Sequence, residues 1–150
     1  MNFLYFYFRE IFKEYFIPLL QELGYLWQSN TISTTHEHFI TNLVKQKVYT
    51  NTEKVHRSEY VNNKSFVLFL PENEIHELGI LYLNYELNLR GYKSIFLGQS
   101  VPIENLEPLM ASNEFVEFIA YVTVEPSKEK IDKYLQKFKK KILDKSIRIR

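Results

Sequence analysis

The sequence has no cysteine among its 150 residues. Disulfide bonds, thiolate metal sites and cysteine nucleophiles are therefore excluded. The longest apolar run near the N-terminus ends well short of the roughly 18 residues that a membrane span needs. That run also lacks the basic segment and cleavage site of a signal peptide. These absences predict a cytoplasmic protein with no membrane partner.

Several catalytic and nucleotide-binding motifs are also missing. There is no G-x-G-x-x-G and no G-x-x-x-x-G-K, so backbone cradling of a phosphate is not indicated. There is also no Ser-His-Asp order, nucleophile elbow or pair of catalytic carboxylates. We therefore expect no catalysis by this chain alone.

The composition is that of a globular protein, with 45% hydrophobic and 25% charged residues. Aromatic residues reach 16%, which suits either a core or the walls of a pocket for a flat ligand. The net charge of +1 conceals a basic tail, because Ser127–Arg150 holds ten Lys or Arg and three Asp or Glu, a balance of +7. Such a tail is either a solvated helix face or a surface for nucleic acid or an acidic partner.

The first part of the chain predicts helices. Apolar residues recur at helical spacing over Tyr5–Gly24. Pro18 predicts a kink within that helix, and Gly24 predicts its end, which leaves Trp27 in the connection.

A second helix is expected from Ser33 or Thr34 to Tyr49. Its predicted start is a capping box formed by Thr34 and Glu37. The polar stretch Asn51–Lys64 that follows reads as an irregular or partly helical bridge between two lobes.

The second part predicts a parallel sheet, because short apolar runs alternate with helical patterns. Each strand–helix–strand unit should be right-handed. The expected strands are Phe66–Leu70, Ser94–Gly98 and Phe115–Val124, and the expected helices are Ile75–Arg90 (ended by Gly91), Asn105–Ala111 and Ser127–Leu143.

The loop after the first strand carries Glu74-x-His76-x-x-Gly79. In open parallel sheets, ligands bind outside the carboxyl ends of the strands. An imidazole there can offer one nitrogen to a metal while a nearby carboxylate accepts the other N–H. Gly79 removes a side chain one turn later, which lets a bulky group approach the backbone. Without a family, a histidine in such a loop is more often an ordinary surface or capping residue than a metal ligand.

The stretch PENEIHELGILYLNYELNLRGYKSIFLGQSVP (71–102) resembles the start of cobalamin-binding Rossmann-like domains. In that family a D/E-x-H-x-x-G motif supplies the lower cobalt ligand. The resemblance implies that His76 is this ligand, Glu74 its carboxylate partner and Gly79 the residue that makes space for the nucleotide tail. The implied cofactor is cobalamin, as adenosylcobalamin or methylcobalamin.

A second stretch, WQSNTISTTHEH (27–38), resembles the helical cap of light- and cobalamin-responsive MerR-type regulators, the CarH-like group. The family has a tryptophan ten residues before a Glu-His pair, as Trp27, Glu37 and His38 are here. The resemblance implies that these residues cover the upper face of the corrin. His36 is expected to face solvent, because adjacent helical residues point in different directions.

The resemblance implies an α/β fold in which a helical-bundle cap precedes a Rossmann-like, flavodoxin-like parallel sheet. The expected domains are residues 1–60, an incomplete four-helix cap, and residues 64–150, a cobalamin-binding domain truncated at its C-terminus. The chain departs from the family in three respects. Ala120 stands where a serine contacts the nucleotide tail, with Thr123 as the nearest hydroxyl. The chain ends at Ser146–Arg150, where a fourth strand should begin, and no winged-helix DNA-binding region is present.

The function implied by the resemblance is a cobalamin-binding sensory domain of a bacterial MerR-family transcriptional regulator. Light sensing, homo-oligomerisation, and DNA binding only through a winged-helix domain outside this chain belong to that expectation. Two alternatives remain. One is the corrinoid-binding component of a methyltransferase, and the other is an interaction module that has lost the cofactor, which Ala120 and the missing strands favour.

Overall fold

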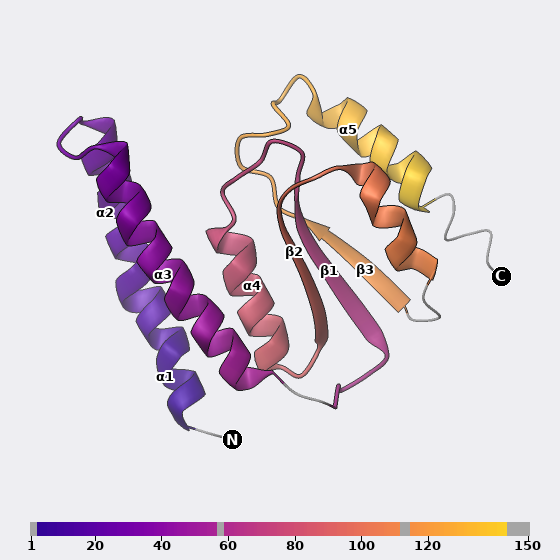
Figure 1. Ribbon diagram of the computed structural model, residues 1–150, viewed down its shortest axis with the longest axis horizontal. Helices are drawn as coiled ribbons and strands as arrows, with labels where there is room; N and C mark the ends of the chain where they lie inside the picture. The colour runs from indigo at the N-terminus through magenta and orange to yellow at the C-terminus, as the bar shows by residue number, and fades with distance from the viewer. Residues whose placement is uncertain (1–2, 57–58, 112–114, 144–150) are drawn as a thin grey trace. The chain divides into compact units, whose positions relative to one another are not determined.

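The computed structural model describes residues 3–56, 59–111 and 115–143. The chain divides into two compact units, Met1–His56 and Arg57–Arg150. In the described residues, no helix is both long and apolar enough to span a membrane. The first unit is helical and the second contains the sheet (Figure 1).

The first unit is a helical hairpin. Its first arm runs through α1 (Phe3–Ile11), a π-helical turn η1 (Phe12–Phe16) and α2 (Ile17–Gln28), and its second arm is α3 (Thr34–Val55). Both α1 and α2 pack against α3. The buried core consists of Phe8, Phe12, Leu23, Val44, Val48 and Val55.

The irregularity near Pro18 is confirmed, whereas the predicted stop at Gly24 is wrong. Proline has no N–H to donate to the preceding turn, and the π-helical segment lies just before it, with Pro18 in the first turn of α2. The helix continues through Gly24 to Gln28, because a helical glycine costs only about 1 kcal/mol and Leu23 beside it is buried. The chain turns instead at Asn30, whose φ is +56°. Trp27 therefore lies in α2.

The predicted capping box is also wrong. The N-cap of α3 is Ser33, and its side chain caps no backbone N–H. Its hydroxyl contacts His36 Nδ1 at 2.8 Å, while the Thr34 hydroxyl accepts a hydrogen bond from Trp27 Nε1 at 3.1 Å. The helix also runs six residues past the predicted end at Tyr49, into the stretch expected to be a bridge.

The second unit contains a three-stranded parallel sheet in the order β2-β1-β3 (Figure 1). In β1, Phe66 pairs with Ser94 of β2 and with Glu117 of β3. The predicted α/β, Rossmann-like class is thus confirmed. The elements are β1 (Lys64–Pro71), α4 (Leu78–Leu89), β2 (Lys93–Val101), η2 (Ile103–Ala111), β3 (Phe115–Ala120), α5 (Ile131–Phe138) and η3 (Lys139–Leu143).

Strand β1 is buried on both faces, as its apolar run predicts. Leu68 and Leu70 pack on Ile80 of α4. Phe69 points to the opposite face and packs on Ile103 of η2 and on Ile142. Helices therefore cover both faces of the central strand, and the strand's C-terminal end leads into the Glu74 loop.

Two element boundaries differ from the predicted ones for a shared reason. Helix α4 begins at Leu78 instead of Ile75, and β3 ends at Ala120 instead of Val124. At both places backbone N–H groups are bonded to the Glu74 carboxylate, which holds these residues in loops outside the helix and the ladder. The last helix is likewise shorter than predicted and ends in a π-helical turn. The fourth strand expected at Ser146–Arg150 lies outside the described residues.

Candidate functional site

The candidate site lies at the carboxyl ends of the three parallel strands. Glu74 and His76 follow β1, Ser100 lies at the end of β2, and Thr123 follows β3. Ser100 N–H donates to the Glu74 carbonyl at 3.2 Å, and its hydroxyl accepts from Asn73 N–H at 3.0 Å. Bonds between these loops hold the strand ends together around Glu74.

The Glu74 carboxylate is buried, with 0% of its side chain exposed. It accepts hydrogen bonds from two loops, one for each oxygen. Oε1 accepts from Ile75 N–H at 2.9 Å, His76 N–H at 3.0 Å and His76 Nδ1 at 2.6 Å. Oε2 accepts from Thr123 N–H at 3.0 Å, the Thr123 hydroxyl at 2.9 Å, Val124 N–H at 2.7 Å and Glu125 N–H at 2.9 Å.

These bonds determine the charge of Glu74. Burial alone acts to raise the pKa of its carboxyl, because burial disfavours the charged form. The backbone N–H groups and the imidazole that donate to it outweigh burial and hold that pKa well below its usual range. Glu74 is therefore an anion at neutral pH.

The charge of Glu74 decides which ring nitrogen of His76 carries the proton between them. An ionised carboxylate can only accept hydrogen bonds, so Nδ1 of His76 carries the proton that it donates to Oε1. In the neutral ring the lone pair is then on Nε2. The side chain is 56% exposed, so the ring is accessible to a ligand although its other nitrogen is anchored. This is the arrangement of a metal-binding histidine with a carboxylate partner.

Gly79 comes three residues after His76, and the Tyr121 ring lies against the Cβ side of its exposed backbone. A Cβ placed on Gly79 would lie 2.8 Å from Tyr121 Oη and 2.9 Å from Cζ. Tyr121 follows β3 directly, and its N–H donates to the Phe69 carbonyl at 3.2 Å. The space left by the absent side chain is thus filled by the tyrosine ring.

Thr123 is close to Glu74, whereas Ala120 brings no hydroxyl. Both donors of Thr123 are used by Glu74 Oε2, so this residue helps to hold the carboxylate. Ala120 is the last residue of β3 and pairs in register with Phe69. The structure therefore brings together Glu74, His76 and Thr123.

The other predicted site residues belong to the first unit. Trp27 is about half exposed and donates to Thr34. Glu37 forms an ion pair with His38 at 2.8 Å and accepts a hydrogen bond from the Thr41 hydroxyl at 2.7 Å. Since His38 is 65% exposed, its ring is accessible on the surface of α3. Among the described residues no group of three His, Asp or Glu could hold a metal ion.

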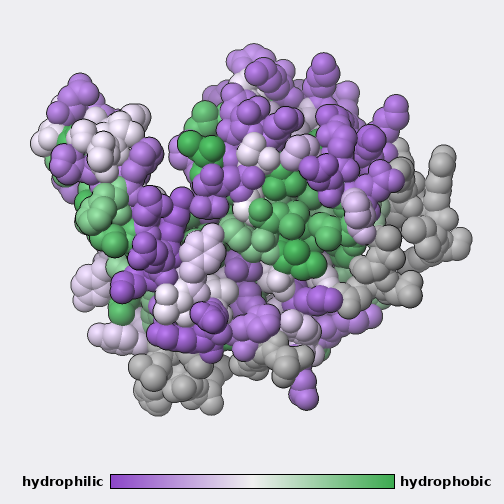
Figure 2. Space-filling view, in the orientation of Figure 1, coloured by the Kyte–Doolittle hydropathy of each residue, from purple (hydrophilic) through white to green (hydrophobic). Residues whose placement is uncertain are grey.

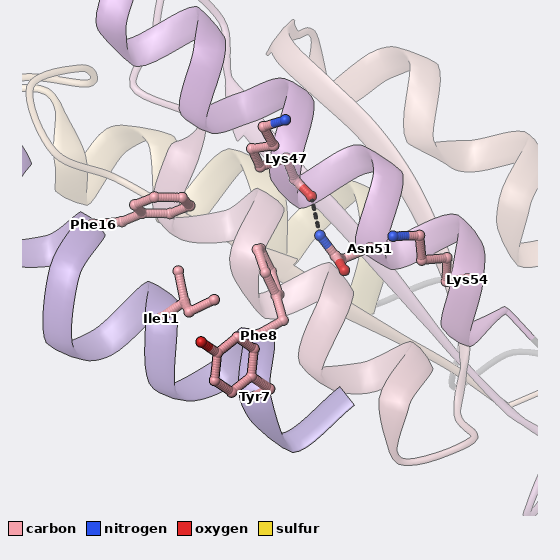
Figure 3. A pocket seen from close by; sticks show the side chains of 7 residues that line it. All are labelled: Tyr7, Phe8, Ile11, Phe16, Lys47, Asn51 and Lys54. Carbon is pink, nitrogen blue, oxygen red and sulfur yellow. Dashed lines mark hydrogen bonds between the residues drawn. The ribbon is translucent and has the colours of Figure 1, made fainter. Parts of the chain in front are cut away.

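A pocket of about 460 Å³ lies in the first unit (Figure 3). Its walls come from α1, the end of η1 and the second half of α3, and Asn51 within it donates to the Lys47 carbonyl at 2.7 Å. Asn51 stands fourteen residues after Glu37 on α3, which places it about 21 Å further along the helix. This pocket is therefore separate from the Glu37–His38 pair.

A second pocket, of about 470 Å³, lies beside the Glu74 loop. It is formed by the Glu72–Asn73 segment, by Glu125 and Pro126, and by α5 with its lysines. Burial raises the pKa of Tyr134 in its wall to about 12. Figure 2 shows a hydrophilic surface over α5, and Lys130, Lys133 and Lys137 are exposed there. The lysines in the described part of the basic tail are therefore in contact with solvent.

Comparison with known proteins identifies the chain's relatives. A family model described as a B12 binding domain matches residues 5–50. Over 95 residues the chain is 30% identical to the HTH-type transcriptional repressor CarH of Myxococcus xanthus, a match covering 63% of this chain and 31% of the repressor. The chain is related to CarH-like cobalamin-binding domains. The predicted resemblance is confirmed, and cobalamin is supported as the cofactor.

The fold of the chain recurs in a solved structure. The monomethylamine corrinoid protein of Methanosarcina barkeri matches it with a TM-score of 0.60 at 16% sequence identity. The match covers 85% of this chain and 60% of that protein. The likeness shows a common fold, and the chain spans about a third of the length of CarH.

Two features of the candidate site were not predicted from the sequence. One is the set of backbone donors at 123–125, which bond to Glu74 about 50 residues earlier in the chain. The other is Tyr121, whose ring lies on Gly79. A glycine in the first turn of a helix, where alanine is preferred, was the one signal that something packs closely at Gly79.

Proposed function

We propose that this chain is the cobalamin-binding sensory domain of a bacterial MerR-family transcriptional regulator, with His76 as the lower axial ligand of cobalt. One observation carries the proposal. The buried Glu74 anion fixes Nδ1 of His76 at 2.6 Å, and the ring is more than half exposed. Nε2 is thus a preoriented ligand at the strand ends, where open parallel sheets bind their cofactors.

The residues around His76 have supporting roles in this proposal. Glu74 selects the tautomer that leaves Nε2 free, and it makes the imidazole a stronger electron donor. Thr123 donates its N–H and hydroxyl to Glu74 and so holds the carboxylate in place. Gly79 comes three residues after His76, where the Tyr121 ring occupies the space that a side chain would fill.

In our proposal the helical unit, residues 1–56, contributes further contacts to the cofactor. Trp27 offers a half-exposed aromatic surface whose indole is held by Thr34. The Glu37–His38 pair offers a polar contact to an axial group. Cobalamins with an alkyl group on cobalt are photolabile, which supplies the chemistry for a light-dependent output.

Regulation would follow from differential binding. A ligand shifts an equilibrium only as far as it binds one arrangement better than another. In our proposal the cofactor stabilises one association state of the chain, a homo-oligomer. DNA binding is assigned to a winged-helix domain outside these 150 residues, and this chain itself catalyses no reaction.

A second candidate function is the corrinoid-carrying component of a methyltransferase. The structural likeness to the monomethylamine corrinoid protein favours it. In that role the exposed His76 would hold a cobalt that accepts and passes on a methyl group. The repressor relationship, at 30% identity over 95 residues, favours the regulatory function.

The test is to mix the purified chain with adenosylcobalamin in the dark. Visible spectra and elution position are then compared for the wild type, His76→Ala and the control His36→Ala. His36 is an exposed histidine of the helical unit bonded to Ser33, so its loss should leave binding unchanged. We expect co-elution with a histidine-ligated spectrum in the wild type and the control, and its loss in His76→Ala.

Two outcomes would contradict this proposal. Absence of retained cofactor in every protein would exclude cobalamin sensing. Equal spectra for the wild type and His76→Ala would remove His76 from the cobalt. Illumination of the loaded protein then separates the two functions, since a changed elution position supports the regulator and an unchanged one supports the carrier.

A further inference from the structure

Glycine is required at position 79 because of the space that a side chain would fill, and not because of its backbone conformation. It is the second residue of α4 and has no left-handed φ, whereas Gly98 at the end of β2 has a φ of +80°. A glycine in a helix is less stable than alanine by about 1 kcal/mol. Around Gly98 an added Cβ would meet nothing nearer than 3.7 Å, while at Gly79 it would lie 2.8 Å from the Tyr121 hydroxyl. Gly79 therefore accommodates Tyr121.

Tyr121 is anchored on both sides along the chain. Its own N–H bonds to the Phe69 carbonyl at 3.2 Å, and two residues later Thr123 is bonded to the buried Glu74. The backbone that carries the ring is thus tied to β1 and to the Glu74 loop. The ring can leave Gly79 only by rotation of its side chain. Since Tyr121 is 39% exposed, that rotation leads toward solvent.

The position of the ring matters if His76 binds cobalt, and the following inference rests on that proposed function. Gly79 comes three residues after His76 at the start of α4, and we place the space beside it on the histidine side of a corrin ring. Cobalamin carries its nucleotide tail on the lower side of that ring. Once His76 takes the lower axial position, the displaced tail must be accommodated next to the histidine. Tyr121 fills this space.

We propose that Tyr121 is a specificity-determining residue that discriminates against the nucleotide tail of the corrinoid, because the tail can enter only when the ring is displaced from Gly79. A corrinoid without the tail meets no such obstacle. The wild-type site therefore binds a complete cobalamin more weakly, relative to its tail-less counterpart, than a site with a small residue at position 121.

The experiment compares adenosylcobalamin with adenosylcobinamide, which carries the same corrin ring and adenosyl group but lacks the tail. Dissociation constants are measured in the dark by calorimetry and by visible spectra for the wild type, Tyr121→Ala and Tyr121→Phe. The phenylalanine variant keeps the ring atoms that lie within 3.3 Å of the Gly79 Cβ position. Circular dichroism establishes that each variant is folded.

We expect Tyr121→Ala to tighten binding of adenosylcobalamin by up to about tenfold relative to adenosylcobinamide, the affinity change of one strong aromatic contact. Tyr121→Phe should keep the wild-type ratio. An unchanged ratio in Tyr121→Ala, with both corrinoids bound, would overturn the role of Tyr121 and leave the proposed function intact. Failure of every variant to bind either corrinoid would overturn the proposed function and this inference with it.

Discussion

Replacing Glu74 with glutamine tests the central anchor of the site. Glutamine has nearly the same shape but presents one oxygen and one NH₂ group. Each Glu74 oxygen faces only donors, three at Oε1 and four at Oε2. Whichever way the amide is turned, its NH₂ group must face hydrogen-bond donors.

Glu74→Gln loses less stability if its amide oxygen faces the 123–125 loop. The NH₂ group then faces the N–H groups of Ile75 and His76 and the His76 ring. The exposed ring can bond to water instead. The two backbone donors cannot do so equally well, and each costs about 1–3 kcal/mol when left unpaired. We therefore expect the free energy of unfolding to fall by about 4 kcal/mol.

Urea unfolding at pH 7, followed by circular dichroism, measures this change. With a denaturant slope of about 1–3 kcal/mol/M, the midpoint should fall by more than about 1 M. The matched control is Glu72→Gln, two residues earlier, because Glu72 is exposed and should change the midpoint little. Equal midpoints for Glu74→Gln and the control would refute the reasoning.

Low pH should also reduce the stability of the folded chain through the Glu74 carboxylate, and the direction of this effect follows from its pKa. The folded-state pKa of Glu74 lies below its usual value. Its contribution to stability is therefore complete above the unfolded pKa of about 4.3 and declines as the pH falls below that value. The wild type should lose stability between pH 5 and pH 3 more steeply than Glu74→Gln, whose amide does not titrate in that range. Parallel pH curves for the two proteins would contradict this assignment.

Three further predictions concern single side chains. His76→Ala should change the unfolding free energy by less than about 1 kcal/mol, because the ring is half exposed, and urea unfolding would show a larger loss if the ring were structural. Gly79→Ala should stabilise α4 by about 1 kcal/mol in a Tyr121→Ala background. It should not do so in the wild type, where the added Cβ lies 2.8 Å from Tyr121. If thermal unfolding shows that the effects of the two substitutions are additive, the contact is excluded. Phe69→Ala should cost about 3–5 kcal/mol, since Phe69 is fully buried and stacks on Phe138, and a urea midpoint near that of the wild type would contradict that packing.

Much of the sheet unit could be predicted from local pattern. The apolar run at Phe66–Leu70 indicated a strand buried on both faces, and packing on both sides of β1 confirms it. Gly91 ends the turn after α4 with a φ of +79°. The proximity of Glu74 and His76 followed from their two-residue spacing. These features depend on residues close together in the sequence.

Features that depend on distant residues could not be predicted. The end of β3 at Ala120 is set by donors at 123–125 that bond to Glu74 instead of continuing the ladder. The helix over Gly24 continues because tertiary packing outweighs a single weak helix former. The covering of Gly79 by Tyr121 requires β1 and β3 to be paired. In each case a contact made only in the folded chain decided against the local signal.

The carboxylate of Glu74 also bears on when the site exists during synthesis. Its partners at Thr123–Glu125 lie 49 to 51 residues further along the chain. When only β1 and α4 of a growing chain have left the ribosome, Glu74 can bond to Ile75 and His76 but not yet to Thr123–Glu125. The bonds from Thr123–Glu125 form only when β3 has emerged and paired with β1, and long-range strand pairing is a slow event in folding. If His76 binds a cofactor as proposed, its loading therefore waits until β3 has paired with β1.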